Sequence, residues 1–199
     1  MYLSEKLKKK INDILVADGV IVYVTDTVWG LGVLPNSEKG VKKIYEIKKR
    51  ESKKPLILMS NEVENLLPYV KTLNDKTKEL IKRHFPGALT LVLEKSEKTP
   101  DFMTSGFDTV GIRVPDNDVF KGICQAIDGH VLATTSANLS NEPSAKTYEQ
   151  AIKNMGGKAD LVIEDYGCFA KGLESTVVLI SGDDVKILRQ GAVLVNGER

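Results

Sequence analysis

Short apolar runs alternate with amphipathic segments along this chain, and that alternation constrains its fold more than any other feature. Residues 20–24, VIVYV, are β-branched or aromatic and suit a strand buried on both faces of a sheet. Strands that alternate with helices indicate an α/β domain around a largely parallel or mixed sheet. The predicted strands cover residues 20–24, 55–59, 88–93, 110–114, 131–135, 161–164, 176–180 and 185–188. The predicted helices cover residues 3–18, 37 towards 50, 74–85, about 117–128 and 147–155.

Composition and length place the chain among globular proteins of one domain. Its 199 residues are 42% hydrophobic and 28% charged, and no repeat or long linker divides them, so we expect one domain over 1–199. No signal sequence and no stretch of about 20 apolar residues is present, which predicts a cytoplasmic protein. Cys124 and Cys168 are too few for a disulfide framework or a four-ligand zinc site. A net charge of +1 argues against nucleic-acid binding over the whole surface.

The lysine-rich segment VKKIYEIKKRESKK contains the most informative single position. Val41 and Ile44 start the apolar stripe of the predicted helix, and Lys48 stands at i+7 from Val41 on the same stripe. A lysine on a buried stripe needs an anionic partner, because an unpaired buried charge is costly. A phosphate-bearing ligand would satisfy it, and Arg50 would add a bidentate fork. The alternative is a solvated helix face, which is typical of charge runs.

A polar loop follows the predicted strand 131–135. It contains Ser136 and Asn138, and Ser144 comes six residues after Asn138. Ligands of open α/β sheets bind beyond the carboxyl ends of strands, and hydroxyl and amide groups supply directed hydrogen bonds to phosphate. The loop is therefore a candidate phosphate site, with an ordinary Ser/Asn turn as the alternative.

Two arginines stand in unusual places. Arg113 lies inside one apolar β run and Arg189 ends another, a combination that favours anion recognition. The phosphate-loop and dinucleotide patterns are missing, no Ser/His/Asp or Cys/His pairing is legible, and Cys124 is assigned to the core. We therefore expect chemistry that depends on positioning and charge stabilisation rather than on a covalent nucleophile.

Several motifs occur in the order typical of one family. They are residues 25–32 (TDTVWGLG), Lys48 with Arg50, residues 86–90 (PGALT), residues 111–115 (GIRVP), Ser136 with Asn138, residues 174–177 (ESTV), and Arg189 with residues 191–192. On these motifs, from about Leu7 to Val193, the chain resembles the YrdC-domain family, and within it the TsaC-type threonylcarbamoyl-AMP synthases. The set of motifs is specific, whereas any single one would be weak.

The resemblance implies both a fold and an activity. The fold is α/β, a twisted open mixed sheet with helices on its faces and a deep basic cavity, without the extra C-terminal domain of the longer synthases. The activity is that of a nucleotidyltransferase, which converts L-threonine, bicarbonate or CO2, and ATP with Mg²⁺ into threonylcarbamoyl-AMP and pyrophosphate. This is the first step of threonylcarbamoyladenosine modification of tRNA. The implied acceptor of the product is a TsaD-containing transferase complex.

The resemblance also implies roles for individual residues. Lys48 and Arg50 are expected to be catalytic. The residues expected to contact ATP are Lys48, Arg50, Lys54, Thr109, Thr134, Ser136, Asn138, Ser144 and Arg189. The residues expected to bind threonine are Thr27, Arg113 and Ser175. We expect the carbamate of threonine to attack the α-phosphate in line, while cationic groups and Mg²⁺ spread the developing charge.

The chain departs from the family's pattern at three positions. Met59 stands where many members carry a histidine that helps to bind threonine, and Val24 and Gln190 replace frequent prolines. Two other functions stay open. One is a non-catalytic protein that binds double-stranded RNA or tRNA, or acts in ribosome maturation. Its affinity for RNA would fall steeply with salt and would not depend on threonine. A carbamoyl-adenylate enzyme that acts on another amine or on carbamoyl phosphate would also be unaffected by threonine.

Overall fold

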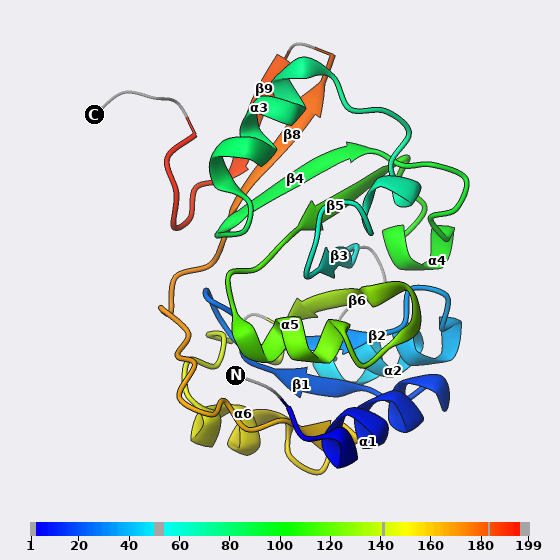
Figure 1. The fold of residues 1–199 in the computed structure, drawn as a ribbon, viewed down its shortest axis with the longest axis vertical. Helices are drawn as coiled ribbons and strands as arrows, with labels where there is room; N and C mark the ends of the chain where they lie inside the picture. The colour runs from blue at the N-terminus through cyan, green and yellow to red at the C-terminus, as the bar shows by residue number, and fades with distance from the viewer. Residues whose placement is uncertain (1–2, 50–53, 141, 183, 196–199) are drawn as a thin grey trace.

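The strands of the described residues form one twisted sheet. In this computed structural model the described residues are 3–49, 54–140, 142–182 and 184–195 (Figure 1). Within these ranges nine strands lie in the order β7-β1-β2-β6-β3-β5-β4-β8-β9. The strands are β1 (Ile21–Tyr23), β2 (Gly30–Val33), β3 (Ile57–Ser60), β4 (Leu89–Glu94), β5 (Thr109–Arg113), β6 (Val131–Ser136), β7 (Leu161–Val162), β8 (Thr176–Ser181) and β9 (Asp184–Arg189). The pairs β1–β7, β3–β5 and β4–β8 are parallel and the other neighbours are antiparallel, so the predicted mixed sheet is confirmed.

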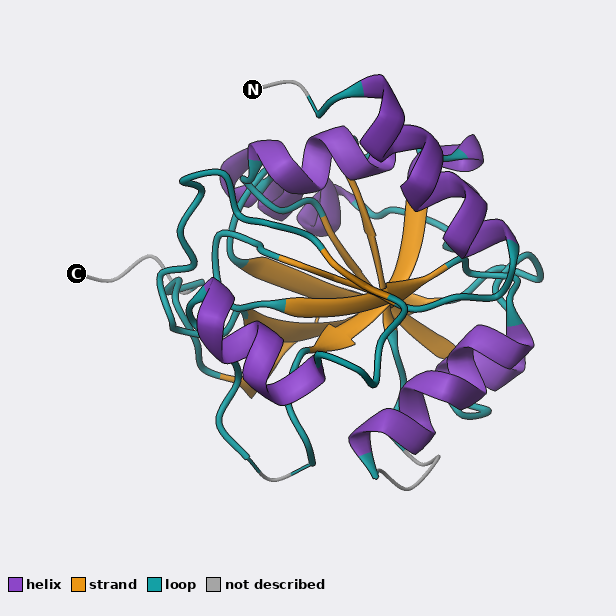
Figure 2. Cartoon of the chain, turned by 90° about the horizontal axis from the view of Figure 1, so that it is seen from below, coloured by secondary structure: helices purple, strands orange, loops and turns teal. Residues whose placement is uncertain are grey.

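Helices surround the sheet, whose strands fan out from the centre of the view in Figure 2. They are α1 (Glu5–Val16), α2 (Glu38–Lys48), α3 (Asp75–His84), α4 (Asp101–Thr104), α5 (Asp118–Cys124) and α6 (Tyr148–Met155), with single 3₁₀ turns at Leu67–Tyr69 and Asp128–His130. α1 contacts β1 and α5, α2 contacts β2, and α6 contacts β7. This arrangement confirms the expected α/β class. None of the described helices is long and apolar enough to cross a membrane.

Side-chain caps fix where most of these helices begin. The oxygen of the residue before the helix accepts a hydrogen bond from a backbone N–H of the first turn, which would otherwise have no partner inside the helix. The capping residues are Ser4 for α1, Ser37 for α2, Asn74 for α3, Asn117 for α5 and Thr147 for α6. The start of α2 matters most for function, because this helix ends at Lys48.

A buried aromatic cluster joins the first strands to the helices. The Tyr23 ring lies 5.2 Å from that of Phe120, and its hydroxyl donates to Thr134 Oγ1 at 2.5 Å. The Trp29 ring stacks on Tyr148 of α6 with 5.8 Å between centroids. Tyr23 and Trp29 are both fully buried, so the loop between β1 and β2 is held at both ends by large side chains.

The element boundaries differ from the sequence predictions in several places. β2 was not predicted, because glycines weaken a strand signal, yet a Cβ on Gly32 would lie 2.7 Å from the Tyr23 ring. The short helix α4 was also missed. The helix predicted over 117–128 ends at Cys124, since Ile127 is extended and Gly129 adopts a φ of 75°. The strand predicted over 161–164 pairs with β1 only over Leu161–Val162, and the one predicted over 55–59 begins at Ile57.

Candidate active site

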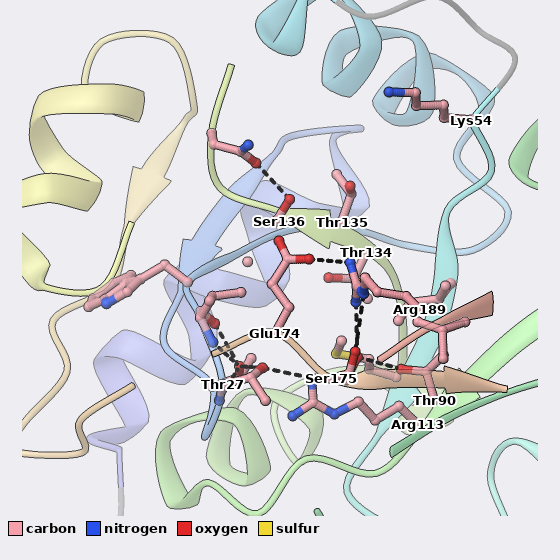
Figure 3. A pocket seen from close by; sticks show the side chains of 18 of the residues that line it. Thr27, Lys54, Thr90, Arg113, Thr134, Thr135, Ser136, Glu174, Ser175 and Arg189 are labelled. Atoms are coloured by element: carbon pink, nitrogen blue, oxygen red, sulfur yellow. Dashed lines mark hydrogen bonds and ion pairs between the residues drawn. The ribbon is translucent and has the colours of Figure 1, made fainter. Parts of the chain in front are cut away.

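A cavity of about 310 Å³ lies over one face of the sheet (Figure 3). Its floor follows the strand register, because directly paired residues point to the same face. Met59 on β3 pairs with Arg113 on β5, and Val177 on β8 pairs with Arg189 on β9. All four residues line the cavity. The sheet thus brings together side chains that are far apart in the sequence.

Most of the residues that the sequence analysis selected meet here. Those that line the cavity are Thr27, Lys48, Lys54, Arg113, Thr134, Ser136, Asn138, Ser175 and Arg189. Ser144 lies next to the lining, and its hydroxyl donates to Glu174 Oε1 at 3.0 Å. Arg50 lies outside the described residues. Thr109 is not among the lining residues. It begins β5, four residues before Arg113, and pairs with Glu94.

Lys48 anchors one end of the cavity. It is 2% exposed, as its place on the apolar stripe of α2 predicts. Its Nζ donates to the Ser136 carbonyl oxygen at 2.5 Å, to the Asn138 carbonyl oxygen at 2.7 Å and to Asn138 Oδ1 at 2.9 Å. The Ser136 hydroxyl donates to the same Oδ1 at 2.6 Å. These three oxygens orient the ammonium group in the cavity wall.

Arg113 anchors the other end and is held on three sides. It is 2% exposed. Its Nε donates to the Gly87 carbonyl oxygen at 2.9 Å, Nη1 to Thr27 Oγ1 at 2.8 Å and Nη2 to Asp26 Oδ1 at 2.5 Å. Burial lowers the pKa of the guanidinium from its ordinary value, and the ion pair with Asp26 opposes that shift. The side chain is therefore a rigid cation with its position fixed before any ligand arrives.

The hydroxyl of Thr27 is oriented by Thr25. Thr25 Oγ1 donates its single hydrogen to the Val28 carbonyl oxygen at 2.6 Å and lies 3.0 Å from Thr27 Oγ1. Thr27 must therefore donate to Thr25, since the Thr25 hydrogen is already used. Thr27 also accepts from Arg113, so its remaining lone pair makes it an acceptor toward a ligand.

Arg189 ties the start of β8 to the end of β9. Its Nη1 forms an ion pair with Glu174 Oε2, its Nε donates to the Ser175 carbonyl oxygen at 3.1 Å, and its Nη2 donates to Ser175 Oγ at 3.3 Å. Ser175 Oγ is also hydrogen-bonded to Thr90 Oγ1 at 2.9 Å. These contacts place a carboxylate, Glu174, inside a cavity that is otherwise lined by cationic, hydroxyl, amide and apolar groups.

Gly191 allows the chain after β9 to lie close to the backbone of Glu174 and Ser175. A Cβ there would lie 2.3 Å from the Glu174 carbonyl oxygen and 2.5 Å from that of Ser175, and both are backbone atoms that cannot rotate away. We expect Gly191→Ala to lower the free energy of unfolding by about 1–3 kcal/mol, the usual cost of overpacking, and to displace Glu174 and Ser175. Denaturant unfolding measures the first effect. Ala192→Ser is the control, because that side chain is exposed; equal stability of both variants would contradict this assignment.

Several lining residues were not selected from the sequence. No role was predicted for Glu174, Thr25 or Thr90, which stand inside the quoted motifs. Asp26 is not among the lining residues, but its carboxylate accepts a hydrogen bond from the Arg113 guanidinium and so helps to fix its position. The available signal was their place inside the motifs TDT, PGALT and ESTV.

The described residues offer no cage for a metal ion, since they contain no group of three or more His, Cys, Asp or Glu side chains that could hold one. Burial raises the pKa of the Cys124 thiol, and this residue is fully buried, so its predicted place in the core is confirmed.

Comparison with known proteins identifies the family. The model of the Sua5, YciO and YrdC proteins, described as "Telomere recombination", matches residues 13–191. The chain belongs to this family. The resemblance seen in the motifs is thus confirmed.

Two relatives carry the same enzyme name. A putative threonylcarbamoyl-AMP synthase of Methanocaldococcus jannaschii is 33% identical over 195 residues, which cover 96% of this chain and 90% of that protein. The threonylcarbamoyl-AMP synthase of Pyrococcus abyssi is 34% identical over 174 residues, and the match covers 87% of this chain but only 51% of the Pyrococcus protein. The chain therefore spans about half the length of this longer relative.

A solved structure shows the same fold. The crystal structure of P. abyssi Sua5 complexed with L-threonine superposes with a TM-score of 0.89 at 31% sequence identity, over 96% of this chain and 56% of that one. The described sheet of this chain is thus that of the Sua5 family, and the cavity occupies one face of it.

Proposed function

We propose that this chain is an L-threonylcarbamoyladenylate synthase. It joins L-threonine, bicarbonate or CO2, and ATP into threonylcarbamoyl-AMP, and pyrophosphate leaves. The names of the two relatives and the threonine bound to P. abyssi Sua5 support the proposal. The proposal extends the activity in those names to a chain whose match covers only 51% of the Pyrococcus enzyme.

The observation that carries the proposal is a cavity with two fixed cationic ends. Arg113 suits the carboxylate of an amino acid, and Thr27 beside it accepts a hydrogen bond from the amine. Lys48, held by Ser136 and Asn138, suits the phosphates of a nucleotide. An amino acid and a nucleotide bound in this way meet in the middle of one cavity, which is what an adenylation reaction requires.

The chemistry proceeds in two steps. The threonine nitrogen bonds to the carbon of CO2, or of bicarbonate with loss of water, and gives a carbamate. A carbamate oxygen then bonds to the α-phosphorus of ATP as the bond to pyrophosphate breaks in line. Lys48 and Arg189 stabilise the negative charge that grows on the phosphate oxygens. The predicted contribution of Arg50 to this charge stabilisation stays part of the proposal.

The place of this activity in the cell follows from the product. A mixed anhydride of a carbamate and AMP is reactive, and a transferase has to consume it. We include in the proposal that a TsaD-containing complex transfers the threonylcarbamoyl group to tRNA in the cytoplasm. Direct contact of this chain with tRNA or double-stranded RNA remains a prediction.

Pyrophosphate release tests the proposal. Purified protein is incubated with MgATP, bicarbonate and L-threonine, and each component is omitted in turn. We expect release that needs all of them. Release that persists without threonine would contradict threonine as the substrate, and no release from folded protein would contradict the proposal.

Serine in place of threonine tests the amino-acid end of the cavity. Met59 is 7% exposed and directly paired with Arg113, so it offers an apolar contact to the threonine methyl group. One methyl group in such a contact is worth about 10–200-fold in kcat/KM. We expect serine to lower kcat/KM by at least about tenfold. Equal rates with both amino acids would contradict the apolar contact.

A further inference from the structure

The proposed reaction needs a proton acceptor. The nitrogen of threonine carries an ammonium proton near pH 7 and has no lone pair with which to attack carbon. An enzyme that positions a base at that proton accelerates such a step by about 10²–10⁴-fold. The sequence alone showed no group for this role.

One side chain in the described lining suits it. The lining contains threonine, serine and asparagine side chains, cationic lysines and arginines, apolar groups, and one carboxylate, that of Glu174. No histidine or cysteine is among these lining residues. Asp26 is not in the lining, and its Oδ1 is bound to Arg113 at 2.5 Å.

Glu174 also lies in the right part of the cavity. Figure 3 shows its side chain extending from the end that holds Thr27 and Ser175 toward Ser136 at the other end. The amine of an amino acid held by Arg113 and the α-phosphate of a nucleotide held near Lys48 have to meet between these ends. Ser144 donates to Oε1 and Arg189 pairs with Oε2, so both oxygens are oriented. The side chain is 37% exposed, which leaves a path for the proton to water.

We propose that Glu174 is the general base that deprotonates the amine of threonine before carbamate formation. The proposal rests on the synthase function given above. A carboxylate oxygen of Glu174 takes one proton from the ammonium nitrogen, and the freed lone pair forms the N–C bond to CO2. One C=O pair moves to oxygen as the bond forms, and the second proton of the nitrogen goes to water. The products are the carbamate, a protonated Glu174 and one hydronium ion, and Glu174 returns its proton to solvent.

This role predicts a particular pH dependence. The charged groups that face Glu174 are Arg189 of β9, which pairs with it, and across the cavity Arg113 of β5, Lys48 at the end of α2 and Lys54 before β3. As pH rises, a growing share of threonine arrives with its amine already deprotonated. A variant without the carboxylate should therefore recover activity at high pH.

Glu174→Gln is the variant to measure, because glutamine keeps the shape and one oxygen acceptor. At pH 7 we expect kcat to fall by about 10²-fold or more, with the KM for ATP and the melting temperature near those of the wild type. The defect should shrink at least tenfold between pH 7 and pH 9.5. Glu174→Asp keeps a carboxylate and should retain more activity than the glutamine variant at pH 7. Glu164→Gln, an exposed glutamate in the segment between β7 and β8, is the control and should match the wild type.

Three outcomes would overturn the inference. A Glu174→Gln variant with wild-type kcat shows that no base is needed there. A defect that is constant with pH and appears in the KM for ATP shows that Glu174 only positions Arg189. Wild-type protein that releases no pyrophosphate with threonine and bicarbonate removes the proposed function itself, and this result is recognised before any variant is compared. If the glutamine variant does not fold, Glu174→Asp takes its place: a kcat defect that shrinks as pH rises supports the inference, and a pH-independent defect in the KM for ATP overturns it.

Discussion

Asp26→Asn is expected to lower the free energy of unfolding by about 3–5 kcal/mol and to weaken threonine binding. Asp26 and Arg113 are 6% and 2% exposed, and their side chains meet at 2.5 Å. Asparagine removes the negative charge and leaves the Arg113 guanidinium buried without its counterion. The freed guanidinium also loses one of the three contacts that fix its direction. Denaturant unfolding measures the stability, and the KM for threonine reports the clamp.

The matched control is an exposed pair on α3. Glu79 contacts Arg83 at 2.7 Å one helical turn away, but both side chains are about half exposed. Water and salt screen such pairs, so Glu79→Gln should leave stability and KM unchanged. If Asp26→Asn is as stable as this control, the buried ion pair is not what holds Arg113.

Lys48→Met should reduce kcat/KM for ATP by about 10²–10³-fold, the usual effect of removing one charge-stabilising donor from an active site. Methionine keeps the apolar stem that continues the stripe of Val41 and Ile44 but has no ammonium group. The variant also loses the hydrogen bonds that connect the end of α2 with Ser136 and Asn138. Steady-state kinetics with varied MgATP at saturating threonine measures the effect.

Lys42→Met on the same helix controls for a general loss of positive charge. Lys42 is exposed and paired with Glu38 at 2.8 Å, away from the cavity lining. We expect wild-type kinetics from it. A Lys48→Met variant that keeps wild-type kcat/KM for ATP would show that the nucleotide phosphates do not bind at this end.

The sequence predicted Lys48 well because its evidence is local. Helical periodicity places it one turn beyond the apolar positions of its own helix, and the structure buries it there. The alternating strands and helices predicted the α/β class for the same reason, since each element is encoded by its own residues. The strand β2 was not predicted because its glycines do not favour a strand. They leave room for the Tyr23 ring on the neighbouring strand.

The assembly of the site could not be predicted in this way. Asp26 and Arg113 are 87 positions apart, and only the order of the strands brings them together. Glu174 precedes an apolar strand and carries no local sign that Arg189 will draw its carboxylate into a cavity. Thr109 shows the reverse case: the family resemblance implied a contact with ATP, but the residue is not among those that line the cavity. Roles that depend on which strands are neighbours need the fold.

Incorporation of ¹³C-bicarbonate tests the central claim most directly. The purified chain is incubated with MgATP, L-threonine and labelled bicarbonate, and the nucleotide products are separated and weighed by mass spectrometry. The account predicts threonylcarbamoyl-AMP that is one mass unit heavier than the product from unlabelled bicarbonate, together with an equal amount of pyrophosphate. AMP adducts that lack the labelled carbon, or no adduct from folded protein, would contradict it.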